Sequence, residues 1–227
     1  MYILVIDDDL FANTLIHFVL KKEGFEVETT DNPNGAIQMI QKREPDLLIV
    51  DVMMPYLSGF EFATKLRESG FDIPFIFMTA QDTLEFKLQG FQIGADDYIC
   101  KPFIHQELVA RVQAVMRRIK KYSKAGNQTI RCGQIELIPG DLKVVMPDHG
   151  EITLTPTEMH VLRVLMASPG QVVKRDRLLE EVWNDNENNS NIVDVYVRRL
   201  RMKLEEDANK PQHITSVRGI GYKFLGN

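Results

Sequence analysis

Over residues 2–102, short apolar runs alternate with amphipathic segments, and this alternation repeats five times. The apolar runs predict strands at 2–6, 25–30, 46–50, 73–79 and 96–100. The amphipathic segments predict helices at about 9–23, 33–43, 58–69, 83–93 and 104–120. Strands that are apolar almost throughout are typical of a parallel sheet covered on both faces. We therefore predict an α/β domain with a doubly wound, five-stranded parallel sheet and a ligand at the carboxyl ends of its strands.

Composition is that of a soluble globular protein, with 44% hydrophobic and 26% charged residues. No apolar run approaches the roughly 18 residues that a membrane helix needs, and the chain opens on a strand pattern rather than a charged leader. We expect a cytoplasmic protein without membrane association. Cys100 and Cys132 lack metal-ligand spacing, so we expect reduced thiols.

Charge is distributed unevenly along the chain. Residues 1–120 hold 12 Lys and Arg against 18 Asp and Glu, a net charge of -6, whereas residues 121–227 hold 15 against 14, a net charge of +1. An acidic front half and a less acidic rear half indicate different partners.

Chemically active side chains follow several of the predicted strands. Asp7 and Asp8 follow the first strand, Asp51 the third, Thr79 ends the fourth and Lys101 follows the fifth. Each one alone is more often a helix cap, a strand-end hydroxyl or a solvated lysine. Because parallel strands end at one edge of a sheet, we expect all five to meet there.

Three carboxylates at one edge are unfavourable without a cation, and hard oxygen ligands suit Mg²⁺ or Mn²⁺. A carboxylate oxygen of Asp51 is then a candidate nucleophile toward a phosphoryl group, with Lys101 neutralising the phosphoryl oxygens and Thr79 donating its hydroxyl. An alternative is a phosphatase similar to haloacid dehalogenases, with Asp7 as nucleophile. That motif expects Thr or Val where this chain has Phe11.

The motifs VIDDD, DLLIVDVMMPYLSGFE, FMTA and GADDYICKPF, in this order, resemble the receiver domain of bacterial response regulators over residues 1–120. The resemblance implies that Asp51 is phosphorylated and Lys101 binds the phosphoryl group. It also implies a cis peptide before Pro102. The implied metal ligands and switch residues are Asp7, Asp8, Asp51 and the Met53 carbonyl for the metal, and Thr79 with Tyr98 for the switch.

Within this resemblance, the OmpR/PhoB subfamily pairs two receivers through the face formed by the fourth helix, fifth strand and fifth helix. The side chains that resemble the intersubunit pairs are Lys87 with Glu107, Asp97 with Arg111, and Asp96 with Arg118. The alternative is that these side chains are solvated surface charges without a role in dimerisation.

Residues 121–127 lose the apolar period and predict a linker. The segment 128–227 then predicts an antiparallel sheet near 130–154, helices at about 156–167, 175–183 and 192–205, and a closing hairpin. In the last helix, Val193, Val197, Leu200 and Leu204 recur at helical spacing and predict its core face. Its arginines predict contacts with DNA phosphates and bases, although such a charge run is usually a solvated face.

The rear segment resembles the OmpR/PhoB winged-helix effector domain, an α+β fold, through LTPTEMHVLRVLMASPGQVVKRDRLLEEVW, VDVYVRRLRMKLE and ITSVRGIGYKF. The implied DNA-binding residues are Asp194, Val195, Arg198, Arg199, Arg201, Ser216, Arg218 and Tyr222. One departure is Asn191-Ile192, where the subfamily often has Arg followed by Ser or Thr. For the polar loop 184–190, the resemblance implies contact with polymerase or DNA.

The sequence thus predicts a transcriptional response regulator rather than a turnover enzyme. We expect a sensor histidine kinase as phosphoryl donor, a homodimer on activation, double-stranded DNA with tandem half-sites, and RNA polymerase as partners. A second hypothesis keeps DNA binding but has dimerisation without phosphate; the presence of all the expected phosphorylation residues weakens it.

Overall fold

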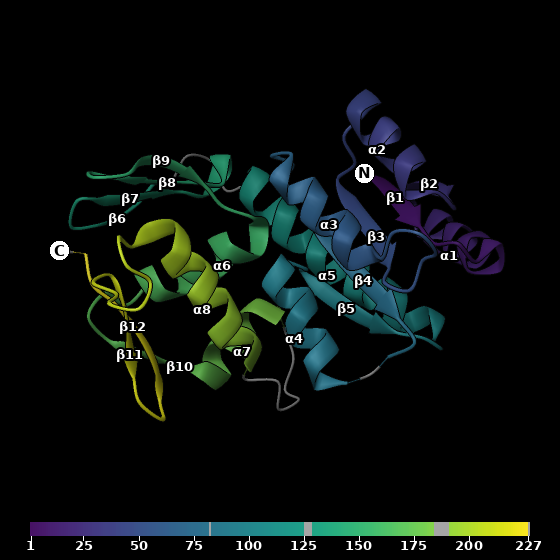
Figure 1. Cartoon of the computed structure of the whole chain (residues 1–227). Coiled ribbons are helices and arrows are strands. Elements are labelled where there is room, and N and C mark those ends of the chain that lie inside the picture. Colours follow the sequence, from purple (N-terminus) through teal and green to yellow (C-terminus); the bar gives the residue numbers. More distant parts are fainter. Residues whose placement is uncertain (82, 125–128, 184–190, 227) are drawn as a thin grey trace. The chain divides into compact units, whose positions relative to one another are not determined.

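The computed structural model describes residues 1–81, 83–124, 129–183 and 191–226. The chain divides into two compact units, Met1–Met116 and Arg117–Asn227 (Figure 1). Each unit is described by itself below. The polar loop at 184–190 lies outside the described residues.

The first unit contains the predicted five-stranded parallel sheet, so the predicted fold class is confirmed. Its strand order is β2-β1-β3-β4-β5. The strands are β1 (Tyr2–Ile6), β2 (Glu26–Thr30), β3 (Leu47–Asp51), β4 (Phe75–Thr79) and β5 (Asp97–Cys100). All residues of β1, β3 and β4 are buried, as their continuous apolar sequences require. Since β1 and β3 are neighbours, the chain order reverses between them, and ligands of such sheets bind at that point.

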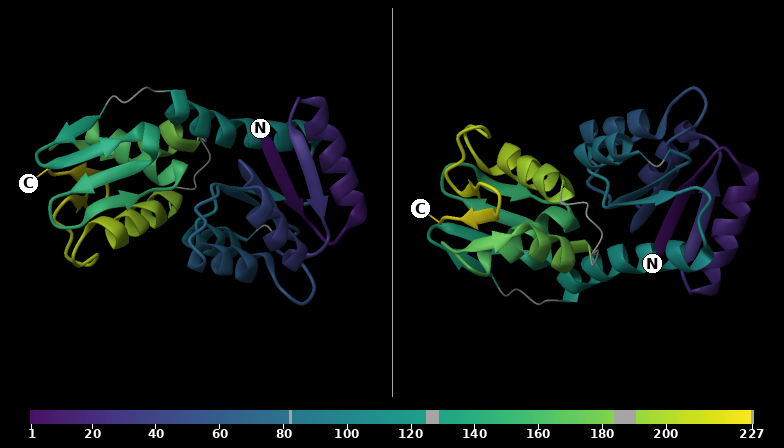
Figure 2. Two further views of the ribbon diagram at one scale, coloured as in Figure 1. Left: turned by 90° about the horizontal axis from the view of Figure 1, so that it is seen from above. Right: turned by 90° about the horizontal axis from the view of Figure 1, so that it is seen from below.

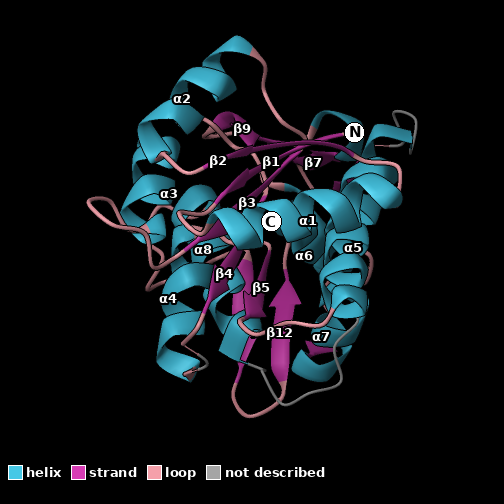
Figure 3. Ribbon diagram, turned by 90° about the vertical axis from the view of Figure 1, so that its right-hand side faces the viewer, coloured by secondary structure: helices cyan, strands magenta, loops and turns pink. Residues whose placement is uncertain are grey.

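Five helices cover this sheet, with α1 and α5 on one side and α2, α3 and α4 on the other (Figure 3). They are α1 (Leu10–Lys22), α2 (Pro33–Lys42), α3 (Gly59–Glu68), α4 (Leu84–Ile93) and α5 (His105–Lys124). Helix α5, seen along its length in Figure 2, continues four residues beyond the predicted end at 120. The predicted linker at 121–127 therefore starts inside a helix, because its lysines are good helix formers.

The second unit has two antiparallel sheets with three helices between them (Figure 1). The four-stranded sheet contains β6 (Ile130–Cys132), β7 (Ile135–Ile138), β8 (Lys143–Met146) and β9 (Gly150–Thr153). The three-stranded sheet contains β10 (Val172–Lys174), β12 (Gly221–Phe224) and β11 (Ile214–Val217), in that spatial order. Strand β10 was not predicted from the sequence. It has only three residues and depends on pairing with β12, almost 50 residues onward.

The helices of this unit are α6 (Pro156–Met166), α7 (Arg175–Trp183) and α8 (Asn191–Leu204), and all three pack on one another. The predicted core residues of α8 are all buried: Val193, Val197, Leu200 and Leu204. Tyr196 is also completely buried, with its ring 5.2 Å from that of Trp183. Sheet, three helices and closing hairpin form the predicted winged helix.

Gly59 marks a close approach between a helix and the sheet of the first unit. Ser58 caps α3 through a capping box with Glu61, which brings the first residue of the helix against the end of β3. A Cβ atom at Gly59 would lie 2.2 Å from the backbone oxygen of Asp51. Any side chain here would thus displace the backbone at Asp51.

We predict that Gly59→Ala lowers the free energy of unfolding of the first unit by about 1–3 kcal/mol, as overpacking generally does. Gly35→Ala is the matched control, because Gly35 is also helical and its Cβ would meet nothing closer than 3.4 Å. The control should be neutral or stabilising, since Ala favours helices. Calorimetry of the full chain measures both effects, and equal unfolding temperatures for the two variants would contradict the prediction.

Candidate functional site

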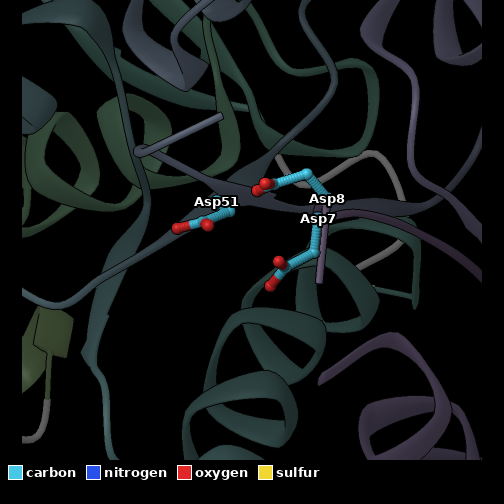
Figure 4. Close-up of side chains that lie close together, drawn as sticks. All are labelled: Asp7, Asp8 and Asp51. Atoms are coloured by element: carbon cyan, nitrogen blue, oxygen red, sulfur yellow. The ribbon is translucent and has the colours of Figure 1, made fainter. Parts of the chain in front are cut away.

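Three carboxylates meet at the carboxyl edge of the parallel sheet. Asp7 and Asp8 follow β1, and Asp51 is the last residue of the neighbouring β3. One oxygen from each lies within 4.8 Å of the others, and Figure 4 shows the three groups gathered around one region. Asp7 and Asp51 are buried, whereas Asp8 is exposed. The cluster therefore has two buried members and one that faces solvent.

Lys101 completes this group from the end of β5. Its ammonium lies 2.7 Å from Asp7 Oδ2 and 3.0 Å from Asp51 Oδ2. The peptide between Lys101 and Pro102 is cis, as the resemblance implied. Lys101, which follows the edge strand β5, thus bridges the acids at the ends of β1 and β3.

Three carboxylates and one ammonium leave the site with an excess of negative charge if all are ionised. Burial raises the pKa of Asp7, and the charge of Asp51 adds to this, while the hydrogen bond from Lys101 opposes it. Burial alone would lower the pKa of Lys101, but its bonds to the two acids outweigh this and raise it. All-oxygen carboxylate donors with a solvent-facing member fit a hard divalent cation such as Mg²⁺ or Mn²⁺.

The predicted switch residues lie in the interior beside this cluster. Thr79 is completely buried, and its hydroxyl accepts a hydrogen bond of 3.2 Å from the backbone NH of Gln81. Tyr98 is also buried, and its ring packs near the ring of Phe77. A Cβ at Gly90 would lie 3.0 Å from the Tyr98 ring, so the glycine makes room for the inward position of that ring. The backbone NH of Met53 faces Asp51 Oδ1 at 3.4 Å.

The charges predicted for a dimer face fall into two environments. Arg111 contacts both Asp97 and Glu107 at 3.0 Å within the same chain, and all three are partly exposed. Asp96, in contrast, is completely buried, and its Oδ2 accepts a hydrogen bond from the backbone NH of Phe75. Asp96 is thus not exposed within a single chain, because its carboxylate substitutes for a backbone partner at the start of β4.

The remaining two members of the predicted dimer face are Lys87 and Arg118. Lys87 lies in α4 and is half-buried. Arg118 lies on α5 beyond the boundary of the first unit, which ends at Met116.

In the second unit, the arginines of α8 face different surroundings. Arg198 is exposed, and among the described residues it makes no ion pair. Arg199 turns inward instead: its Nε and Nη2 donate to Glu158 Oε1 at 3.0 and 2.8 Å. Lys203 contacts the other oxygen of Glu158 at 2.8 Å. The run of arginines is therefore not one continuous exposed surface.

Glu158 is a buried residue whose ion pairs the sequence did not reveal. It also forms a capping box with Thr155 at the start of α6. Burial alone would raise the pKa of the Glu158 carboxyl, but the charges of Arg199 and Lys203 outweigh this and lower the pKa to about 2. One completely buried acid thus anchors two basic side chains of α8.

A second polar network joins α8 to the closing hairpin. Asp194 Oδ1 accepts from the Tyr222 hydroxyl at 2.6 Å and from Arg175 Nε at 2.8 Å. Burial raises the pKa of Tyr222 to about 12, and the hydrogen bond with Asp194 adds to this effect. Arg201 donates to the backbone oxygen of Ile214 and to Ser216 Oγ at 2.9 Å. Four of the predicted DNA-binding residues therefore form hydrogen bonds between α8 and the closing hairpin: Asp194 with Tyr222, and Arg201 with Ser216.

The other two predicted DNA-binding residues are Val195 and Arg218. Val195 is half-buried on α8, and Arg218 is exposed in the turn between β11 and β12. Arg198 and Arg218 are thus the exposed arginines on the helix and hairpin of this unit.

Comparison with known proteins gives two family matches: a response regulator receiver domain at residues 3–113 and the C-terminal domain of transcriptional regulatory proteins at residues 149–224. The alkaline phosphatase synthesis transcriptional regulatory protein PhoP of Bacillus subtilis is 37% identical, over 98% of this chain and 95% of its own. The response regulator MprA of Mycobacterium bovis is 40% identical, over 97% and 95%.

Solved structures agree with these matches. The response regulator DrrB of Thermotoga maritima, an OmpR/PhoB homologue, is 31% identical, with 99% of each chain covered and a TM-score of 0.51. A mutant of RitR is 27% identical, with 100% of this chain and 99% of the other covered and a TM-score of 0.78. Among the described residues, no helix has the length and apolar character needed to cross a membrane.

We predict that Glu158 makes the stability of the second unit depend on pH. Its folded pKa of about 2 lies below the ordinary 4.5, so its contribution is present above pH about 5 and is lost as the pH falls toward 2. The shift corresponds to about 3 kcal/mol. Urea unfolding followed by fluorescence of Trp183, the only tryptophan, measures this unit in the full chain.

Glu158→Gln should flatten this pH dependence, because the amide does not ionise. The control is Glu151→Gln, which removes an exposed acid paired with Lys143 on the four-stranded sheet. The control should keep the pH dependence of the wild-type chain. An unchanged pH dependence in Glu158→Gln would assign the acid sensitivity to other groups.

Proposed function

The chain belongs to the OmpR/PhoB-type response regulators, which regulate transcription in a phosphorylation-dependent manner, and on this basis we propose that Asp51 is its phosphoacceptor. The observation that carries the proposal is the contact of 3.0 Å between the Lys101 ammonium and Asp51 Oδ2, at the edge where Asp7 and Asp8 also lie. A histidine kinase is the phosphoryl donor that a receiver domain implies.

In the proposed transfer, a carboxylate oxygen of Asp51 forms a bond to phosphorus while the bond from phosphorus to the donor nitrogen breaks. The electron pair of that bond leaves with the imidazole, which is reprotonated from water. Lys101 moves its N–H donors from the carboxylates to the phosphoryl oxygens. Mg²⁺ or Mn²⁺, held by Asp7, Asp8, Asp51 and the Met53 carbonyl, would supply positive charge to the same oxygens.

Phosphorylation then acts as a switch through Thr79 and Tyr98. The Thr79 hydroxyl leaves its contact with Gln81 to donate to the phosphoryl group, and the phosphorylated state retains the inward position that the Tyr98 ring already has beside Gly90. In thermodynamic terms the phosphoryl group shifts the population toward one arrangement of β4, β5 and α4.

This arrangement favours a homodimer through α4, β5 and α5. The intrachain contacts of Arg111 with Asp97 and Glu107 have counterparts across a two-fold axis, where Asp97 pairs with Arg111 of the second copy and Lys87 pairs with Glu107. A pair between Asp96 and Arg118 has less support, since Asp96 already binds the Phe75 backbone.

In the dimer, each second unit binds one of two tandem DNA half-sites. Helix α8 reads the major groove with the exposed Arg198 as its principal cation, and Arg218 at the turn of the hairpin enters the minor groove. Arg199, which Glu158 holds through its Nε and Nη2, would contact DNA from the same helix. RNA polymerase is the further partner that a transcriptional regulator requires.

We predict that acetyl phosphate with Mg²⁺ adds one phosphoryl group to the full chain, measured by intact mass, and that chelation of the cation prevents this. Asp51→Asn should gain no mass, because its amide is a poor nucleophile. The matched control is Asp72→Asn, an exposed residue before β4 at the opposite end of the strands.

Two results would contradict the assignment: labelling that persists in Asp51→Asn, or a wild-type chain that dimerises and binds DNA equally well without phosphate. The second result would favour a regulator that acts without phosphorylation.

DNA selected from a random pool allows the arginines to be compared by fluorescence anisotropy. Arg198→Ala should weaken binding to the selected site by about 1–3 kcal/mol and relax its sequence preference, whereas Arg218→Ala should weaken binding with less effect on preference. Arg199→Ala should lower both DNA affinity and the stability of the second unit, because it breaks the ion pair with Glu158.

Arg131→Ala is the charge-matched control, since Arg131 is exposed on β6 and pairs with Glu136. It should leave DNA affinity within about twofold of wild type at moderate salt. Equal losses in the Arg131, Arg198 and Arg218 variants would mean that α8 and the hairpin have no special role.

A further inference from the structure

Asn13 is a polar side chain buried in the first turn of α1. Only 4% of its surface is exposed, and its Nδ2 donates to the backbone oxygen of Asp7 at 2.7 Å. A longer contact of 3.5 Å joins the same nitrogen to the backbone oxygen of Thr30, at the end of β2. Asn13 therefore connects α1 to the ends of two strands, directly behind the acid cluster.

The orientation of this amide follows from its neighbours. Both contacts are carbonyl oxygens, so the NH₂ group has to face them and the carbonyl oxygen faces away. That oxygen, Oδ1, is buried and has no hydrogen-bond partner among the described residues. A buried unsatisfied acceptor generally costs about 1–3 kcal/mol, so an amide at this position is not favoured by stability alone.

Asp7 shows what the contact achieves. Its backbone NH donates to the Thr30 oxygen at 3.2 Å, its Oδ1 accepts from the Asp9 NH at 3.0 Å, and its Oδ2 accepts from Lys101 at 2.7 Å. The bond from Asn13 holds the fourth polar group, the Asp7 carbonyl. Because the peptide unit is planar, fixing this carbonyl also sets the direction in which the chain continues to Asp8.

We propose that Asn13 is a positioning residue for divalent-cation binding, acting through the peptide between Asp7 and Asp8; the inference rests on the proposed function. Without the bond from Asn13, the exposed Asp8 carboxylate is no longer held toward Asp51, although Asp7 keeps its contact with Lys101. Residues that orient metal ligands without touching the metal contribute about 10–100-fold to metal affinity.

The test is the affinity of the full chain for Mg²⁺ and Mn²⁺ by titration calorimetry, with no phosphodonor present. Asn13→Leu keeps the size of the side chain but removes the donor, and it should bind either cation about tenfold more weakly. The control Thr14→Val alters the next residue of α1, an exposed side chain whose hydroxyl donates to the Leu10 oxygen, and it should bind as wild type does.

A second readout separates positioning from a structural role. The Mg²⁺ concentration for half-maximal labelling of Asp51 by acetyl phosphate should rise about tenfold in Asn13→Leu, while the rate at saturating Mg²⁺ stays within about twofold of wild type. If Asn13→Leu does not fold, Asn13→Ala, which leaves space for water, is measured in the same way.

A purely structural Asn13 would give a lower unfolding temperature with unchanged cation affinity, and that result would overturn the inference. If the wild-type chain binds no cation and gains no phosphoryl group, the proposed function itself fails. If wild type behaves as proposed and the Asn13 variants match it, only the inference fails.

Discussion

Mutual repulsion of three carboxylates at the end of a parallel sheet is the constraint on which the first unit depends. Asp7, Asp8 and Asp51 lie within 4.8 Å of one another, and Lys101 is the ammonium that contacts two of them. The strand order makes this meeting unavoidable, because β1 and β3 are neighbours and both run toward the same edge. The site is therefore a place where charge is concentrated and only partly balanced, which suits a phosphoryl acceptor that works with a cation.

In the second unit it is positive charge that is concentrated, on helix α8. Its last long helix carries many cations, and the buried Glu158 balances two of them from another helix, Arg199 and Lys203. Asp194 similarly balances Arg175. In both units, then, buried or partly buried groups of opposite charge set where the charged side chains lie: Lys101 in the first unit, and Glu158 and Asp194 in the second.

Features that depend on neighbouring residues could be predicted from the sequence, whereas features that depend on contacts between distant residues could not. Strand and helix positions were predicted well because apolar periodicity is local, and the acids at the strand ends follow from that periodicity plus parallel topology. Strand β10 was missed, since three residues carry no period and the strand exists only through β12. The partner of Arg199 was missed because Glu158 lies 41 residues away, and no spacing rule connects α6 with α8.

The resemblance to a family indicates which residues match its motifs, but it does not give the burial or the hydrogen-bond partners of those residues in this chain. It implied that Asp96 pairs with Arg118 between subunits, and it gave no sign that the carboxylate is completely buried and bonded to the Phe75 backbone. It also says nothing about Asn13, whose importance appears only when the Asp7 carbonyl has to be given a hydrogen-bond partner. Accounting for each buried polar group thus finds residues that motifs do not.

Ion pairs within the second unit already neutralise several of its basic side chains, and this changes how many DNA counterions those side chains can release. A cation that already faces a carboxylate releases few counterions when it approaches a phosphate, so the number of basic residues on α8 overstates its electrostatic affinity. Arg199, Lys203 and Arg175 are all in this condition. Recognition by this protein should therefore depend less on salt, and more on shape and base contacts, than its run of arginines implies.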